Sequence, residues 1–173
     1  QPSSRRKVRS LGLDAFPASF GADLDRFTAR LAAPDPLDPE ALPSPLRPAT
    51  VNNRRWQAIH LTSALVEAGV PAAEIDGLSA LIAEDRPERG LRELIARNGG
   101  KSSPGIADAA VMLKVVARRH VRAPEQVQAS IARLASRVSP PSSTGLSAKN
   151  RDRLRPFENP ETLRRLLRLP EAL

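Results

Sequence analysis

The chain has 173 residues, which allows one domain of about 100 to 150 residues with extensions but not two full-sized domains. It has no cysteine and two histidines, which excludes disulfides, thiolate metal sites and cysteine nucleophiles and argues against a histidine-based metal site. The 27 lysine and arginine residues outnumber the 19 acidic residues, so the net charge of +8 indicates a polyanionic partner. No apolar run approaches the roughly 20 residues of a membrane span and no signal-peptide pattern follows the basic start, so we expect a soluble intracellular protein.

The first third of the chain predicts an arm, a helix and a linker. Residues 1–16 contain a basic run without helical periodicity and are predicted to form a flexible basic arm. Apolar residues recur at steps of four, three and four over 18–32, which predicts an amphipathic helix. These residues are Phe20, Leu24, Phe27 and Leu31. Residues 33–47 are rich in proline, which fixes φ and lacks an N–H, and are predicted to form an extended linker.

The middle of the chain predicts three further helices. Thr50 is the predicted N-cap of a helix that ends near Ala68, with Gly69 as its stop signal. A short helix is predicted over 75–83, and another over 87–97, where Asn98, Gly99 and Gly100 follow.

The strongest start signal in the chain is Ser103, an N-cap, followed by Pro104 in the first helical position. The helix that begins there is predicted to run to about Val121, with one apolar side and one basic side. The apolar side is marked by Ile106, Ala110, Leu113 and His120, and the basic side by Lys114, Arg118 and Arg122. A helix over 124–138 and two short helices, over 147–154 and 160–169, complete an all-α chain in which no strand is predicted.

Catalytic motifs are missing. Neither His60 nor His120 belongs to a recognised catalytic pattern, and both are interpreted as ordinary helix residues. The Gly-Gly-Lys-Ser sequence at 99–102 lacks the upstream glycine of a phosphate-binding loop. We therefore expect no catalytic residue, no metal and no cofactor in this chain.

Nucleic-acid binding fits the residues better. Helix N-termini present free N–H groups to phosphate, and an α-helix fits the major groove, where arginine reads guanine and asparagine reads adenine. Each candidate taken alone could equally be a cap or a solvated cation, but their joint occurrence favours DNA binding. The candidate DNA-binding residues are Thr50, Asn52, Asn53, Arg54, Arg55, Lys101, Ser102, Ser103, Lys114, Arg118, Arg119 and Arg122.

Several stretches resemble a known family. PLRPATVNNRRWQ, SALVEAGVP, LIARNGGKSSPGIADAAVMLKVVARRHV and GLSAKNRDRLRPFENPETLRRLLRLPEAL are similar to the region that precedes the catalytic domain in bacterial tyrosine recombinases, the phage-integrase-like site-specific recombinases. The resemblance runs from about Pro17 to Leu173. Its most specific pieces are GLSAKNRDRLRPFENP and NGGKSSPGIADAAVMLK, whereas the basic arm matches nothing in the family.

The resemblance implies a SAM-like core-binding bundle over 17–122, with the proline-rich segment as an insertion and with additional helices over 123–173 that lead to an absent catalytic domain. It implies double-stranded DNA at a recombination half-site as partner, other recombinase protomers on that DNA, and a bacterial cytoplasmic location. The family cleaves DNA with a tyrosine nucleophile, and this chain contains no tyrosine. The chain is therefore not expected to be an enzyme on its own.

A protein-interaction module is the alternative interpretation. In that case the basic surface would dock an acidic partner or a neighbouring protomer, and the leucines of the terminal segment ETLRRLLRLPEAL would form an apolar patch. Neither interpretation includes a small-molecule substrate or a membrane.

Overall fold

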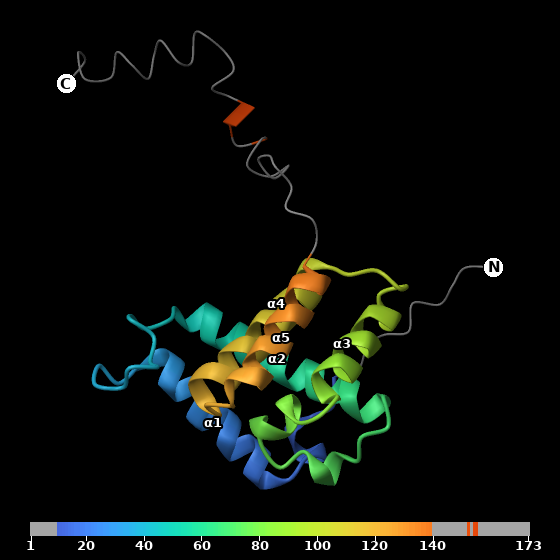
Figure 1. The fold of residues 1–173 in the computed structure, drawn as a ribbon, viewed down its shortest axis with the longest axis horizontal. Coiled ribbons are helices and arrows are strands. Elements are labelled where there is room, and N and C mark those ends of the chain that lie inside the picture. Colours follow the sequence, from blue (N-terminus) through green and yellow to red (C-terminus); the bar gives the residue numbers. More distant parts are fainter. Residues whose placement is uncertain (1–9, 140–151, 153, 156–173) are drawn as a thin grey trace. The chain divides into compact units, whose positions relative to one another are not determined.

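The computed structural model describes residues 10–139 together with residues 152, 154 and 155 (Figure 1). The regular elements among these residues are all helical and no strand occurs among them, which confirms the predicted all-α class. The chain divides into two units, residues 1–140 and residues 141–173, and the elements below belong to the first. In chain order they are η1 (Leu13–Ala15), α1 (Ala18–Ala32), α2 (Pro48–Glu67), η2 (Ala72–Glu74), η3 (Leu78–Ile82), α3 (Arg86–Arg97), α4 (Pro104–Val115), the π-helical turn η4 (Val116–His120) and α5 (Glu125–Val138).

Helix α1 carries the predicted apolar stripe into the core. All four stripe residues are 3 % exposed or less, as expected for positions that share one helix face. They are Phe20, Leu24, Phe27 and Leu31. Helix α1 packs against α2, so the prediction for this segment is confirmed.

Helix α2 is the centre of the bundle and packs against α1, α3 and α4. Its buried residues include polar ones, which bond back to their own helix: the Thr62 hydroxyl donates to the Ala58 carbonyl at 2.6 Å and the Ser63 hydroxyl to the Ile59 carbonyl at 2.7 Å. A helix buried on several sides shows little amphipathic contrast, which explains its weak sequence periodicity.

Helices α2 and α3 approach each other closely at Gly90. A Cβ at this position would lie 2.8 Å from Leu61 Cδ1 and 3.4 Å from Leu65 Cδ2. Only a residue without a side chain fits this contact at the observed helix separation. The helix predicted over 87–97 is confirmed with a start one residue earlier, at Arg86.

The single short helix predicted over 75–83 is wrong in type, because the 3-10 turn η3 replaces it over Leu78–Ile82. The start of η3 is fixed from outside the segment, since the Leu78 N–H donates to the Asp23 carboxylate of α1 at 2.8 Å. The apolar residues behind the prediction are buried all the same: Leu78, Leu81 and Ile82.

Helices α4 and α5 lie side by side (Figure 1) and pack against each other. Ile131 and Val138 of α5 are buried, and Val127 and Leu134 pack partly buried against the same core. The domain boundary predicted after Arg122 is therefore too early, because α5 completes the core of the first unit. The short helices expected over 147–154 and 160–169 lie outside the described residues except at positions 152 and 154, which are helical.

The flexible arm predicted over 1–16 is wrong for its last residues. Phe16 is 6 % exposed and its ring lies 5.2 Å from that of Phe20, centroid to centroid. The Leu11 N–H donates to the Ser63 hydroxyl at 2.9 Å, which ties this segment to α2. Hydrophobic burial therefore fixes residues 11–16 on the bundle, while residues 1–9 lie outside the described part.

The segment 33–47, which we name the proline strap, is folded onto the bundle and is not an extended linker. The Asp35 and Asp38 carboxylates accept the N–H groups of Leu37 and Glu40, at 2.9 and 3.0 Å, which turns the chain twice. Leu42 and Leu46 pack partly buried against the core. Proline removes regular structure here, but turns and apolar contacts hold the strap in place.

Candidate nucleic-acid interface

The start of α4 has the geometry that its sequence predicts. The Ser103 hydroxyl accepts the Ile106 N–H at 3.4 Å and Pro104 occupies the first turn. Just before it, the Ser102 hydroxyl donates to the Val138 carbonyl at the end of α5, and the Asn98 side chain donates to the Lys101 carbonyl at 2.7 Å. The predicted cap is confirmed, and Lys101 is left exposed beside the positive end of the helix dipole.

The start of α2 differs from the prediction. The helix begins at Pro48 with Arg47 as its N-cap residue, so Thr50 lies inside the first turn and is not the cap. The helix starts earlier than predicted because the fixed φ of Pro48 suits the first helical position. Asn52 and Asn53 are exposed on this turn.

The two arginines that follow are held by protein groups. Arg54 Nη1 donates to Gln57 Oε1 at 3.0 Å and to the Asp108 carbonyl of α4 at 3.2 Å. The Arg54 guanidinium is half-buried, which lowers its pKa. The nearby negative charge of Asp108 opposes that effect. Arg55 forms an ion pair with Asp25 of α1. The Arg54 contact joins this part of α2 to α4, and the Arg55 contact joins it to α1.

The continuous basic side that the sequence predicts for this helix is interrupted at the C-terminal end of α4. The α-helix ends at Val115 and continues as the π-helical turn η4, so Lys114, Arg118 and Arg122 do not repeat on one regular α-helical face. Arg122 adopts a positive φ of 55°. Lys114 is exposed and makes no ion pair with another described residue.

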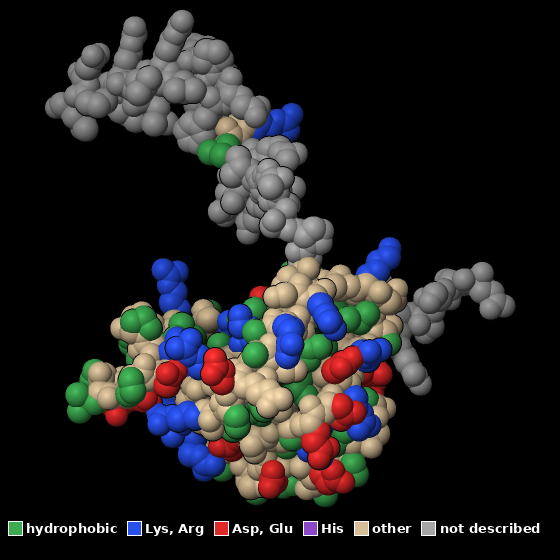
Figure 2. All heavy atoms as spheres, in the orientation of Figure 1, with side chains coloured by type: hydrophobic (Ala, Val, Ile, Leu, Met, Phe, Trp, Pro, Cys, Tyr) green, Lys and Arg blue, Asp and Glu red, His purple; other side chains and the backbone are tan. Residues whose placement is uncertain are grey.

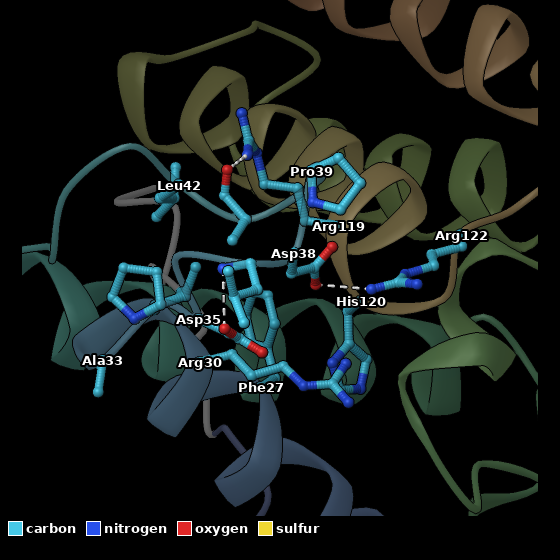
Figure 3. A pocket seen from close by; sticks show the side chains of 14 residues that line it. Phe27, Arg30, Ala33, Asp35, Asp38, Pro39, Leu42, Arg119, His120 and Arg122 are labelled. Carbon is cyan, nitrogen blue, oxygen red and sulfur yellow. Dashed lines mark hydrogen bonds and ion pairs between the residues drawn. The ribbon is translucent and has the colours of Figure 1, made fainter.

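The three arginines after α4 contact the proline strap, and Figure 3 shows two of them, Arg119 and Arg122. Arg118 Nε lies 2.9 Å from Glu40 Oε2 and Arg122 Nη2 lies 2.6 Å from Asp38 Oδ2. Arg119 Nη1 donates to the Glu40 and Ala41 carbonyls, both at 2.7 Å. In the folded chain these predicted DNA contacts already have acceptors. A cavity of about 460 Å³ is lined by the strap, by α1 residues such as Phe27, and by Arg119 and Arg122.

His120 sits on the inner side of this turn, as its position in the apolar stripe predicts. Its side chain is 7 % exposed and its Nε2 lies 2.9 Å from Asp23 Oδ1. Burial raises the pKa of Asp23, but the Leu78 N–H and His120 outweigh it, so the pKa lies below its usual 3.8. The pair joins α1 to η3 and η4 and is a structural contact within the core.

Two arginines of the basic surface are not among the DNA-binding residues that the sequence predicted. Arg133 and Arg137 are exposed on α5 and neither makes an ion pair with another described residue. They are four residues apart on α5, and this spacing is the signal that could have found them. Figure 2 shows basic side chains over α5, whereas acidic side chains gather at the lower right, over the segment from η2 to the start of α3. The exposed acids of that segment are Glu74, Asp76, Glu84 and Asp85.

The predicted residues thus lie at separate places along α4. Residues 101–103 precede its start, Arg54 of α2 contacts Asp108 further along it, and Lys114 and the strap-bound arginines lie towards its other end. At 1.5 Å per residue, Ser103 and Arg118 are separated by roughly 20 Å, the length of about six base pairs of DNA. Among the described residues no cluster of three metal-ligating side chains occurs, so the site offers cations, amides and helix N–H groups.

The chain matches no protein-family model, no curated protein and no solved structure. None of the helices in the described part is both long enough and apolar enough to cross a membrane.

Proposed function

We propose that this chain binds double-stranded DNA, as the SAM-like core-binding region of a bacterial tyrosine recombinase in the cytoplasm. The observation that carries the proposal is a set of exposed cations on α4, α5 and the turn before α4 that pair with no other described residue. They are Lys101, Lys114, Arg133 and Arg137. A folded protein with a net charge of +8 that keeps these cations unpaired offers phosphate groups an electropositive surface.

In this proposal, phosphate contacts provide the affinity for DNA. Residues at the start of α2 provide the preference for particular DNA sequences. Each lysine or arginine that replaces a counterion on DNA strengthens binding without reading the sequence. Asn52 and Asn53 are exposed and have the amide groups that read adenine. Arg54 would have to leave the Asp108 carbonyl before it could contact a base. The asparagines are therefore the better candidates for direct readout.

The family assignment adds the biological context. Because the chain contains no tyrosine, it supplies no phosphotyrosyl nucleophile, and strand cleavage would belong to a catalytic domain beyond Leu173. The proposed role of this chain is to hold one recombination half-site while that domain acts.

The experiment compares two double variants of equal charge. Arg133→Gln with Arg137→Gln removes two unpaired cations from α5, and Arg89→Gln with Arg92→Gln removes two cations of α3 that lie beside Asp85 and Glu88. The α5 variant should lower the slope of log K against log salt by about 1.8, at about 0.9 per phosphate contact. The α3 variant should change it little. Equal changes in both variants would mean that net charge alone controls binding and would contradict the proposed face.

A groove favours protein interaction as the second candidate function. About 430 Å³ of space lies between the segment 82–88 and α5, with an apolar floor that includes Pro87, Val127 and Ile131. Acidic and basic side chains border it, including Glu88 and Arg137. A partner helix with both charges would fit this groove, and the same salt titration discriminates, because an interaction module predicts only weak attraction to duplex DNA.

A further inference from the structure

The only tryptophan of the chain lies on the surface beside the proposed DNA-binding residues. Trp56 is 53 % exposed and follows the exposed Asn52 and Asn53 by one helical turn. Its ring is stacked on that of His60, with centroids 4.7 Å apart and an angle of 12° between the planes. The Trp56 ring is not part of the hydrophobic core, and it is not among the DNA contacts proposed above.

Trp56 borders a cavity of about 210 Å³ to which three helices contribute, and we name it the Trp56 pocket. This volume is smaller than that of a typical drug site and suits a single ring system. The described lining includes no carboxylate. It consists of Trp56, His60, Leu94, Arg97, Asn98, Ser103, Gly105 and Ile106.

The wall opposite Trp56 offers hydrogen-bond donors at the start of α4. Pro104 has no N–H, and the N–H groups of Ile106 and Ala107 go to the Ser103 carbonyl. The Gly105 N–H is thus the donor of this turn that no described acceptor takes. A Cβ at Gly105 would meet nothing closer than the Ser103 hydroxyl at 3.9 Å, so the backbone is open at this point.

Arg97 contributes a second, independent donor. Its side chain is 11 % exposed and is held by Glu67 at 2.8 Å and Glu93 at 3.2 Å, while its buried Nη1 has no partner in the described structure. An unpaired buried donor is costly, and a shift of the Arg97 side chain that opened Nη1 to the pocket would let a ligand acceptor satisfy it. Burial, and then the charge of Arg97, lower the pKa of His60 below 6.5 against the opposing effect of Glu67. His60 is therefore neutral at pH 7 and supports Trp56 as an uncharged ring.

A flat ring surface beside N–H donors is suited to a nucleotide. Every nucleobase can stack on an aromatic side chain, whereas bases inside a duplex are already stacked on each other. We propose that the Trp56 pocket binds one unpaired nucleotide of single-stranded DNA, with the base on Trp56 and the phosphate at the start of α4, an inference that rests on the proposed DNA binding.

The fluorescence of Trp56 reports directly on this pocket, because the chain has no other tryptophan and no tyrosine. A short oligothymidine is titrated into the full chain while indole emission is recorded, and a labelled duplex is titrated separately by anisotropy. The expected result is saturable quenching of Trp56 by the oligothymidine. Binding of the oligothymidine with unchanged emission would overturn the inference while duplex binding stands. Failure of both DNAs to bind would overturn the proposed function as well.

Two variants separate stacking from general affinity. Trp56→Leu should weaken binding of the labelled oligothymidine by about 5- to 150-fold, the range for one stacked base, and leave duplex affinity unchanged. Gly105→Ala places a methyl group on the pocket wall without a clash inside the protein, and should weaken the oligothymidine while Trp56 still reports. Gly21→Ala on α1, where a Cβ meets nothing within 4 Å, is the matched control. Equal losses for single strand and duplex would contradict a separate nucleotide site.

Discussion

Neutralising the acidic side chains of the proline strap should strengthen DNA binding. The double variant Asp38→Asn with Glu40→Gln removes the partners of Arg122 and Arg118, which lie 2.6 and 2.9 Å away. Both arginine side chains are more than half exposed, at 57 % and 60 %, so they can reach a phosphate once the strap carboxylates are gone. In the unchanged chain DNA must first displace these carboxylates.

The size of the effect follows from the exposure of the pairs. An exposed ion pair is worth about 0.2 to 1 kcal/mol, so two pairs cost DNA binding about 0.4 to 2 kcal/mol. At 1.4 kcal/mol per factor of ten, affinity should rise by about 2- to 30-fold. Two additional phosphate contacts should also steepen the salt slope by about 1.8. The strap should stay in place, because Arg119 still donates to the Glu40 and Ala41 carbonyls.

The assay is anisotropy of a labelled duplex at several salt concentrations, with thermal unfolding as the check on folding. Asp35→Asn is the matched control, since Asp35 lies in the same strap but accepts only the Leu37 N–H and faces no arginine within ion-pair distance in the described structure. An equal gain for Asp35→Asn would show that the overall charge acts, and unchanged affinity in the double variant would refute the role of Arg118 and Arg122.

Gly90→Ala should destabilise the bundle by about 1 to 3 kcal/mol in urea unfolding, because its Cβ would lie 2.8 Å from Leu61 Cδ1. Gly21→Ala, with no atom within 4 Å of its Cβ, should instead stabilise by up to about 1 kcal/mol, and equal effects would contradict the close helix contact. Because the pKa of His60 is lowered in the fold, its contribution to stability is complete above pH 6.5 and declines as the pH falls below that value. His60→Gln should flatten this decline in unfolding measured at successive pH values, and an unchanged profile would show that other groups cause it.

Patterns in the sequence predicted those features of the fold that depend on contacts between residues close together in the chain. The stripe of α1 and the Ser103 cap follow from residues within one or two turns, and both are confirmed. The all-helical class follows from the same patterns. Thr50 was misplaced as a cap because Pro48 also starts helices, and the sequence alone does not rank the two signals.

Contacts between distant segments could not be predicted in this way. Arg118 meets Glu40 across 78 positions, and no periodicity connects a proline-rich segment with the end of a later helix. The interpretation of Arg118 and Arg122 as open phosphate contacts therefore missed their partners. Only the packing of three helices shows that the ring of Trp56 borders a pocket.

The most direct test of the account is the salt dependence of duplex DNA binding by the unchanged chain. Contacts from Lys101, Lys114, Arg133 and Arg137 predict that log K falls linearly with log salt with a slope of about −3.6, at about 0.9 per phosphate contact. The titration is made between about 50 and 200 mM salt with a random duplex and with the ends of candidate mobile elements. Tighter binding to one element end would support a recombination half-site. A slope near zero, or no binding at the lowest salt, would contradict DNA binding as the function of this surface.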